Sequence, residues 1–148
     1  MSALARRLPV FAAALWWGSL TAIGFIAVPL LFAHLPTPAM AGYAAARIFT
    51  AQTWVSLACC VLLLIASKQN EPAAPANTAV AAIVFIVLGL LLALLVEYAV
   101  APRIVARQNL RLWHGVGTAM YAVQWLCAAA TLWKVSSATT HDQAAPLP

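Results

Sequence analysis

Four long apolar runs, separated by three shorter connections, constrain this chain more than any other feature. The runs cover residues 8–33, 47–67, 78–101 and 110–134. A helix needs roughly 20 predominantly apolar residues to cross a bilayer, and each run reaches that length. Of the 148 residues, 65% are hydrophobic and only 7% are charged. The sequence therefore predicts an all-α, integral membrane four-helix bundle that forms a single domain over residues 1–135.

Breaks between the runs predict where the helices end. The segment 34–46 contains two prolines and a glycine, so we expect a turn there. The connection KQNEPAAPAN at 68–77 is polar and separates the two halves of the chain. Pro102 should end or kink the third helix, because proline lacks the backbone N–H that a helix interior needs. Residues 136–148 are polar and lack periodicity, so we expect a disordered tail.

Small residues predict how the helices pack. Gly18 lies between Ala14 and Ala22 at four-residue spacing, which makes a smooth strip where a neighbouring backbone could approach. Gly115 is expected to serve the fourth helix in the same way, and Pro29 should kink the first helix near its far end. The strip suits packing within one chain or between two copies, so a homo-oligomer stays an open alternative.

The second helix carries a weakly polar stripe of Gln52, Ser56 and Cys59 or Cys60. We interpret it as a set of interhelical hydrogen bonds, worth about 0.6 kcal/mol each, and keep a ligand-binding face as the alternative. The cysteines, with Cys127, show neither a disulfide framework nor C-x-x-C spacing. We interpret them as small packing residues.

Chain connectivity brings the unusual ionisable residues to one membrane face. In four successive crossings, the first helix ends on the same face where the second begins, and the third ends where the fourth begins. Intramembrane ionisable residues are functional candidates, so we predict a basic polar mouth on this face. Its expected members are His34, Arg47, Gln52, Glu97, Tyr98, Arg103, Arg107, Arg111 and His114.

Glu97 has two interpretations. It lies four residues before Ala101, which is about 6 Å inside the helix end. It is either an interfacial anchor or the partner of an arginine. On the second interpretation Arg111 and His114 should line a common mouth with Glu97 and Arg47 rather than face lipid, because an unpaired charge in hydrocarbon is costly.

The fourth helix carries a second polar stripe, formed by His114, Thr118, Tyr121 and either Gln124 or Trp125, and we count Tyr121 and Gln124 among the ligand-binding candidates. The spacing predicts that this stripe faces the interior of the bundle. A lone histidine is more often a hydrogen-bonded structural residue than a ligand, so His114 is only a weak candidate for binding a metal.

Three segments together resemble a known family: LWWGSLTAIGFIAVPLLF at 15–32, RIF at 47–49, and VAPRIVARQNLRLWHGVGTAMYAVQ at 100–124. The pattern resembles the transmembrane protein 205-like family, small multi-helix membrane proteins that contain a domain of unknown function. It is also distantly similar to copper-resistance D-type and HemJ-type membrane proteins, some of which are linked to copper uptake or haem. The departures are that no histidine precedes Trp16 and that no Met-rich or His-rich path is evident.

Three functional hypotheses remain. The protein is a non-enzymatic binding or transport component whose mouth receives an anionic small molecule or lipid headgroup, since arginine suits planar anions. Alternatively, His114 ligates haem or copper, or the chain is a structural subunit. We predict no other cofactor, and no enzyme, because the serines and cysteines lack neighbouring bases. Nucleic acid is excluded as a partner, because the basic residues are scattered singly despite the net charge of +5.

The lipid bilayer is the expected partner, and a bacterial inner membrane is the expected location. Counts of Lys and Arg on the two faces tie, so the positive-inside rule gives no orientation by number. We predict cytoplasmic termini, because the first helix usually dominates and Arg6 and Arg7 precede it.

Overall fold

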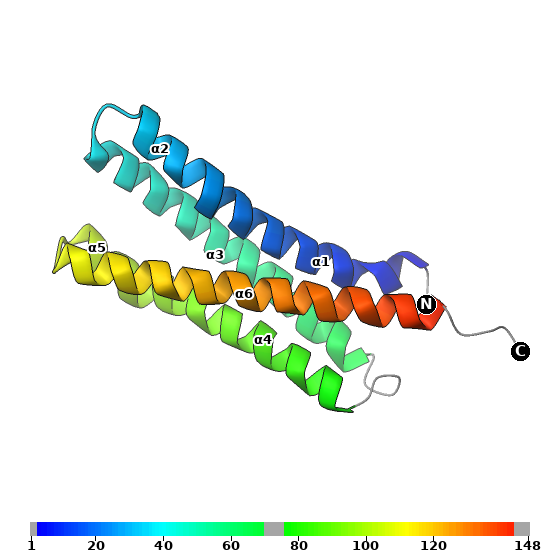
Figure 1. The fold of residues 1–148 in the computed structure, drawn as a ribbon. Coiled ribbons are helices and arrows are strands. Elements are labelled where there is room, and N and C mark those ends of the chain that lie inside the picture. Colours follow the sequence, from blue (N-terminus) through cyan, green and yellow to red (C-terminus); the bar gives the residue numbers. More distant parts are fainter. Residues whose placement is uncertain (1–2, 70–75, 144–148) are drawn as a thin grey trace, which may run out of the picture.

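Helices make up nearly all of the computed structural model, which describes residues 3–69 and 76–143. No strand occurs in these two ranges. Two short π-helical segments, η1 and η2, continue directly from one α-helix into the next (Figure 1). In chain order the elements are α1 (Ala3–Ala22), η1 (Ile23–Ala27), α2 (Val28–His34), α3 (Pro38–Gln69), α4 (Ala76–Leu95), η2 (Val96–Val100), α5 (Ala101–Val105) and α6 (Leu110–Gln143).

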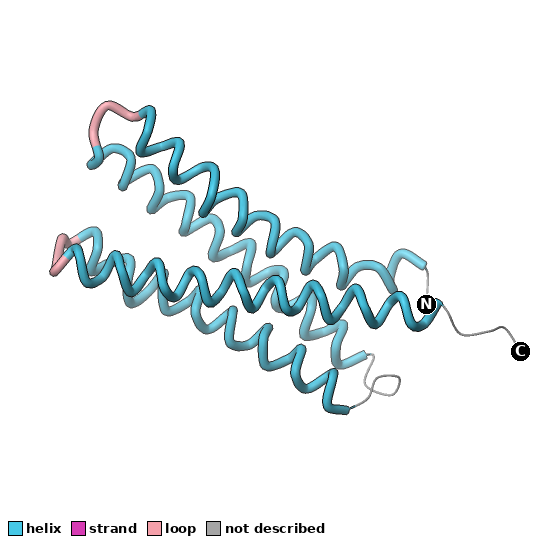
Figure 2. Tube along the Cα trace, in the orientation of Figure 1, coloured by secondary structure: helices cyan, strands magenta, loops and turns pink. Residues whose placement is uncertain are grey.

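The elements of the described chain form four rods that pack side by side (Figure 1). The rod α1–η1–α2 and helix α3 form a first hairpin, and the rod α4–η2–α5 and helix α6 form a second hairpin. Helices α1 and α4 each pack against both α3 and α6, so the rods contact their neighbours around a square. Connections 35–37 and 106–109 lie at the same end of the bundle (Figure 2).

A proline follows each π-helical segment. Pro29 lies at the start of α2, and Pro102 lies at the start of α5. In both rods the first residue after the π segment donates its N–H to the carbonyl five residues earlier. The wider turn makes room for a ring that would otherwise clash with the preceding turn. Of the two alternatives predicted for Pro102, an end of the helix or a kink, the first is therefore wrong, because the rod continues to Val105.

Helix α3 begins at Pro38, well before the predicted start at residue 47. The side chain of Thr37 accepts a 3.2 Å hydrogen bond from the backbone N–H of Met40, which caps this helix. Proline is favoured in the first turn, where its missing N–H has no helical partner anyway. The prediction of a turn through residue 46 was wrong because this proline starts a helix instead of breaking one.

Helix α6 continues past Lys134, its predicted end, to Gln143. The hydroxyls of Ser136 and Ser137 lie 3.0 and 2.8 Å from the carbonyl oxygen of Trp133, so these polar residues bond back to their own helix. The prediction of a disordered tail is therefore wrong for residues 136–143, whereas 144–148 lie outside the described residues.

Large side chains fill the centre of the bundle. Trp16 and Leu20 from α1, Leu63 from α3 and Ile86 from α4 are fully buried. The cysteines act as packing residues there, because all of them are free thiols and buried: Cys59, Cys60 and Cys127. The core therefore draws on both hairpins.

The small-residue strip predicted on the first helix is not its packing face. Ala14 and Ala22 are exposed, and a methyl group placed on Gly18 would meet no atom within 4 Å. Gly115 is equally open. The buried face carries Trp16 instead, because a large ring buries far more area than a strip of small residues.

Two other glycines make the close approaches. A methyl group on Gly89 would lie 2.6 Å from Cη2 of Trp16, and one on Gly24 would lie 2.8 Å from Cε1 of Tyr121. Each glycine thus leaves the space that an aromatic ring of another helix occupies. Both contacts join the first hairpin to the second.

Three helices of the described chain are long and apolar enough to cross a membrane: Arg7–His34, Pro38–Lys68 and Val80–Val105. Helix α6 is not among them, because polar residues such as His114 and Gln124 interrupt its apolar sequence. Large apolar side chains such as Phe11 and Trp54 point outward, as they do where lipid is the solvent. The fold is that of an all-helical membrane protein with three apolar spans.

Candidate functional site

Gln52 lies near the middle of the bundle, but the other predicted mouth residues lie toward the end that holds the connections 35–37 and 106–109. We call it the arginine end after its basic members, which are Arg47, Arg103, Arg107 and Arg111. All four arginines are exposed, as are His34 and His114. The structure thus brings the basic residues to one end of the molecule, on its surface.

Two of these arginines lie over aromatic rings. The guanidinium carbon of Arg103 is 4.7 Å from the centre of the Trp113 ring, and that of Arg47 is 5.7 Å from the Tyr43 ring. Arg103 also donates to the carbonyl oxygen of Ala99. A cation over an aromatic face gains about 0.5–1 kcal/mol at exposed sites, so these contacts hold the arginines at the surface.

The turn before α6 presents the third arginine. Arg107 and Asn109 have φ angles of 54° and 37°, a left-handed conformation that is uncommon outside glycine. The carbonyl of Asn109 accepts the N–H of Trp113, so Asn109 directly precedes the helix. This tight reversal places Arg107 at the tip of the second hairpin.

Glu97 is half-buried, and no ion pair joins it to an arginine among the described residues. Its Oε1 accepts a 2.8 Å hydrogen bond from the hydroxyl of Thr50 on α3. A pairing of Glu97 with an arginine is therefore not observed, and the site shared by Glu97, Arg47, Arg111 and His114 stays a prediction. Arginine side chains at the surface reach water or lipid headgroups, so the acid inside the bundle is not needed to neutralise them.

The stripe predicted on the fourth helix turns inward only in its second half. Gln124 is buried and Tyr121 half-buried, but His114 and Thr118 are exposed. The hydroxyl of Thr118 bonds to the carbonyl of His114 within the helix. The prediction that His114 faces the interior is wrong, because the start of α6 packs against α5 and η2 of its own hairpin.

The interior polar residues form a separate cluster near the middle of the bundle, which we call the polar junction: Trp16, Ser19, Gln52, Ser56 and Gln124. Ser56 is its centre. Its hydroxyl oxygen lies 3.2 Å from Trp16 Nε1, 3.3 Å from Gln52 Nε2 and 3.2 Å from Gln124 Nε2. Gln52 Nε2 also donates to Ser19 at 3.0 Å. Three rods thus meet at one hydroxyl.

More N–H groups converge on the Ser56 hydroxyl than its oxygen can accept. A hydroxyl oxygen has two lone pairs, so at most two of the three N–H groups at Ser56 bond to it at one time. Gln52 Oε1 is buried and has no hydrogen-bond partner among the described residues. Gln52 keeps Ser19 as a second acceptor, whereas Trp16 and Gln124 depend on Ser56 in the described structure.

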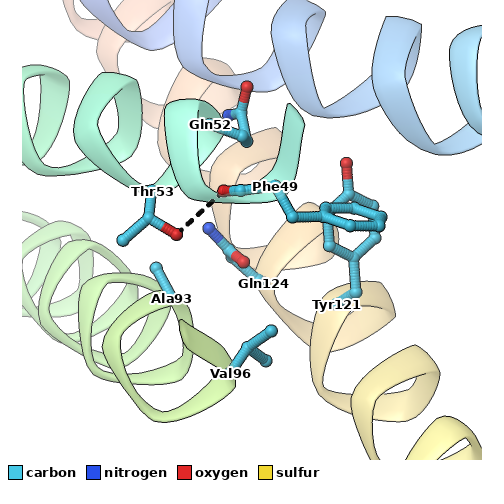
Figure 3. Close-up of a pocket in the computed structure, with 7 residues that line it drawn as sticks. All are labelled: Phe49, Gln52, Thr53, Ala93, Val96, Tyr121 and Gln124. Atoms are coloured by element: carbon cyan, nitrogen blue, oxygen red, sulfur yellow. Dashed lines mark hydrogen bonds between the residues drawn. The ribbon is translucent and has the colours of Figure 1, made fainter. Parts of the chain in front are cut away.

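A small cavity lies beside the junction (Figure 3). Its volume of about 10 Å³ is at the lower limit for a single water molecule. Phe49 and Tyr121 close one side, with ring centres 5.3 Å apart. The hydroxyl of Thr53 bonds to the carbonyl of Phe49 rather than across the cavity. This space is too small for an organic ligand.

Sequence reasoning found Gln52, Ser56 and Gln124 but missed their donor Trp16. It also missed Thr50, the partner of Glu97. Periodicity shows which residues share a face of one helix, but it does not show which residue of another helix lies opposite. No residue pattern within α1 or α3 marked these two contacts.

Long apolar helices around a buried, hydrogen-bonded polar cluster define a multi-pass helical membrane protein. The chain belongs to the family described as Domain of unknown function (DUF4149), which matches residues 11–112. The match covers the first hairpin apart from its first turns. It also covers the rod α4–η2–α5 and the turn that carries Arg107. No curated protein and no solved structure matches the chain.

Proposed function

We propose that this protein is a non-enzymatic membrane component whose arginine end binds an anionic group, either a lipid phosphate or a small soluble anion. Phosphate and carboxylate share the planar or forked oxygens that a guanidinium recognises. The proposal keeps the anion at the membrane surface. The polar junction, by contrast, holds the helices together.

Exposure of the arginines is the observation that carries this proposal. Arg103, Arg107 and Arg111 lie on the end of α5, the connection 106–109 and the start of α6, respectively, and all three are exposed. The nearest acid, Glu97, already accepts a hydrogen bond from Thr50. Basic side chains near an anionic membrane surface each contribute about 1 kcal/mol to its attraction.

We further propose that α6 is a fourth span and that the termini are cytoplasmic. A bilayer-crossing α6 would place its buried face, including Gln124 and Thr131, against the other rods. The resemblance to the transmembrane protein 205-like family fits such a bundle. Nothing in the described residues favours the haem or copper alternative, since His34 and His114 are exposed on different hairpins.

Thermal unfolding of the purified protein in detergent tests the anion proposal. We would add phosphatidylglycerol, phosphatidylcholine or inorganic phosphate in separate experiments. A ligand that binds only the folded state raises the free energy of unfolding by RT ln(1 + L/Kd), where L is the free ligand concentration. If the site binds a lipid, phosphatidylglycerol should raise the Tm and inorganic phosphate should not. If the site binds a soluble anion, inorganic phosphate should raise the Tm as well.

The control is a variant of equal charge loss at the other end. The Arg103→Gln, Arg107→Gln, Arg111→Gln variant should lose the shift, whereas the Arg7→Gln, Lys68→Gln, Lys134→Gln variant should keep it. An equal shift with phosphatidylcholine, or a full shift in the triple arginine variant, would overturn the proposal.

A further inference from the structure

The two hairpins match in the order of their elements. Elements η2 and α5 begin 73 residues after η1 and α2, respectively. Pro29 and Pro102 are separated by the same interval, and each is the second residue after a π-helical segment. Helix α6 begins 72 residues after α3, because α5 is two residues shorter than α2 and the second connection, 106–109, is one residue longer than the first, 35–37. The same arrangement thus occurs twice in one chain.

Burial follows the same intervals. In the first rods of the two hairpins, Ala13, Trp16 and Leu20 are buried, and so are Ile86, Gly89 and Ala93, each 73 residues later. In the second rods, Gln52, Ser56 and Cys59 are buried, and so are Gln124, Ala128 and Thr131, each 72 residues later. Corresponding rods therefore bury the same face.

Equivalent residues also contact one another across the bundle. Trp16 packs onto Gly89. The rings of Phe49 and Tyr121 meet at 5.3 Å, and each is followed three residues later by a buried glutamine, Gln52 or Gln124. Both glutamines donate to the hydroxyl of Ser56. Equivalent residues meet in this way only close to a two-fold axis.

Packing of the rods obeys the same symmetry. Exchanging the hairpins turns the contact between α1 and α6 into the contact between α4 and α3, and both contacts are present. The short helices behave differently, because α2 packs on α3 and α5 on α6, each within its own hairpin. Each π-helical segment thus separates a part of the rod that holds the hairpins together from a part that does not.

We propose that the chain is a duplicated hairpin with a two-fold axis along the membrane normal, and that η1 and η2 are equivalent hinges. The arginine end opens and closes about these hinges while the polar junction stays closed. π turns with a following proline lack the regular α-helical bonding, so they bend more readily than the α-helices on either side. Parallel repeats about such an axis occur in membrane transporters that move in halves.

Distances between spin labels test this proposal in the full chain, with the three buried cysteines replaced by alanine. One pair, Ala39→Cys with Gln108→Cys, spans the arginine ends of the two hairpins. The other pair, Lys68→Cys with Ser137→Cys, spans the hairpins at the opposite end. In lipid nanodiscs the first pair should give a broad distance distribution and the second a narrow one.

Straightened variants separate a hinge from a loose end. Deleting exposed Ile26 with Pro29→Ala removes the extra residue of η1, and deleting exposed Tyr98 with Pro102→Ala does the same for η2. Each change should narrow the first distribution to a similar extent, and both together should narrow it to the width of the second. Pro38→Ala, outside both hinges, should leave it unchanged.

The result that overturns the proposal is a first distribution as narrow as the second, or one that stays broad after both hinges are straightened. An effect from only one hinge would overturn their equivalence. If the deletions prevent folding, the Pro29→Ala and Pro102→Ala variants provide the same comparison at full chain length.

Discussion

The hydroxyl of Thr50 lies 2.8 Å from Oε1 of Glu97 and joins α3 of the first hairpin to η2 of the second. It is a link between hairpins beyond the polar junction, toward the arginine end. The carboxylate, which the sequence marked as the only acid in an apolar run, is therefore satisfied by a neutral donor. That arrangement leaves the arginines available at the surface.

Removal of this link should lower stability. Thr50→Val keeps the shape of the side chain but takes the donor from Glu97, so we expect a loss of about 1 kcal/mol in unfolding free energy in detergent. The matched control is Thr53→Val, because the Thr53 hydroxyl bonds only to the carbonyl of Phe49 in its own helix. Equal losses in the two variants would contradict a role for the interhelical bond.

A double-mutant cycle measures the pair itself. Thr50→Val and Glu97→Gln together should cost less than the sum of the single changes, because both remove the same contact. Replacing Glu97 in an Arg111→Leu background should instead be additive, since Glu97 bonds to Thr50 and forms no ion pair with Arg111 in the described structure. Coupling between Glu97 and Arg111 would instead support the shared mouth predicted from the sequence.

Ser56 should be the most sensitive polar residue of the bundle. Ser56→Ala takes the acceptor from Trp16 and Gln124 at once, and buried unpaired donors cost about 1–3 kcal/mol each in water-soluble proteins. Ser67→Ala is the matched control, because Ser67 bonds only to the carbonyl of Leu63 in its own helix. Thermal unfolding should show a clearly larger fall in Tm for Ser56→Ala, and similar falls would contradict the junction.

The contact between Gly89 and the ring of Trp16 gives a test of packing. Gly89→Ala puts a methyl group 2.6 Å from the Trp16 ring, so it should destabilise by about 1–3 kcal/mol through overpacking. Gly18→Ala, where the space is open, should be neutral. A loss at Gly18 and none at Gly89 would favour the small-residue strip expected from sequence over the observed face.

Topology needs a measurement that follows α6 across the membrane. Cysteines placed at Gln108 and Ser137, in a chain whose native cysteines are buried, should react with impermeant reagent from opposite sides. With cytoplasmic termini, Gln108→Cys labels in intact cells and Ser137→Cys labels only after lysis. Labelling of both from one side would remove α6 as a span.

Helix existence was the part of the fold that sequence could predict. Apolar runs long enough for a bilayer are a one-dimensional signal, so the four rods lie near the expected ranges. The predicted helix boundaries were wrong where a proline is compatible with the start, the interior or the end of a helix. Pro38 starts a helix because Thr37 caps it, and Pro102 continues one because a π turn precedes it. Neither outcome follows from the residue types alone.

The sequence predicted which end of the bundle the arginines occupy, but not how the buried polar residues group. Arg103, Arg107 and Arg111 do lie at one end, because connectivity alone decides which helix ends share a face. Whether a side chain points into the bundle depends on rotation of each helix about its axis. Trp16 determines that rotation for α1, and its partners Ser56 and Gly89 lie on other rods.

Binding of anionic headgroups at the arginine end is the central proposal for this protein. Native mass spectrometry of protein extracted gently from membranes with equal phosphatidylglycerol and phosphatidylcholine measures this directly. We predict that phosphatidylglycerol is the main retained lipid, and that the Arg103→Gln, Arg107→Gln, Arg111→Gln variant loses this preference while the Arg7→Gln, Lys68→Gln, Lys134→Gln variant keeps it. Equal retention of the two lipids by the unaltered protein, or an unchanged preference in the triple arginine variant, would contradict the account.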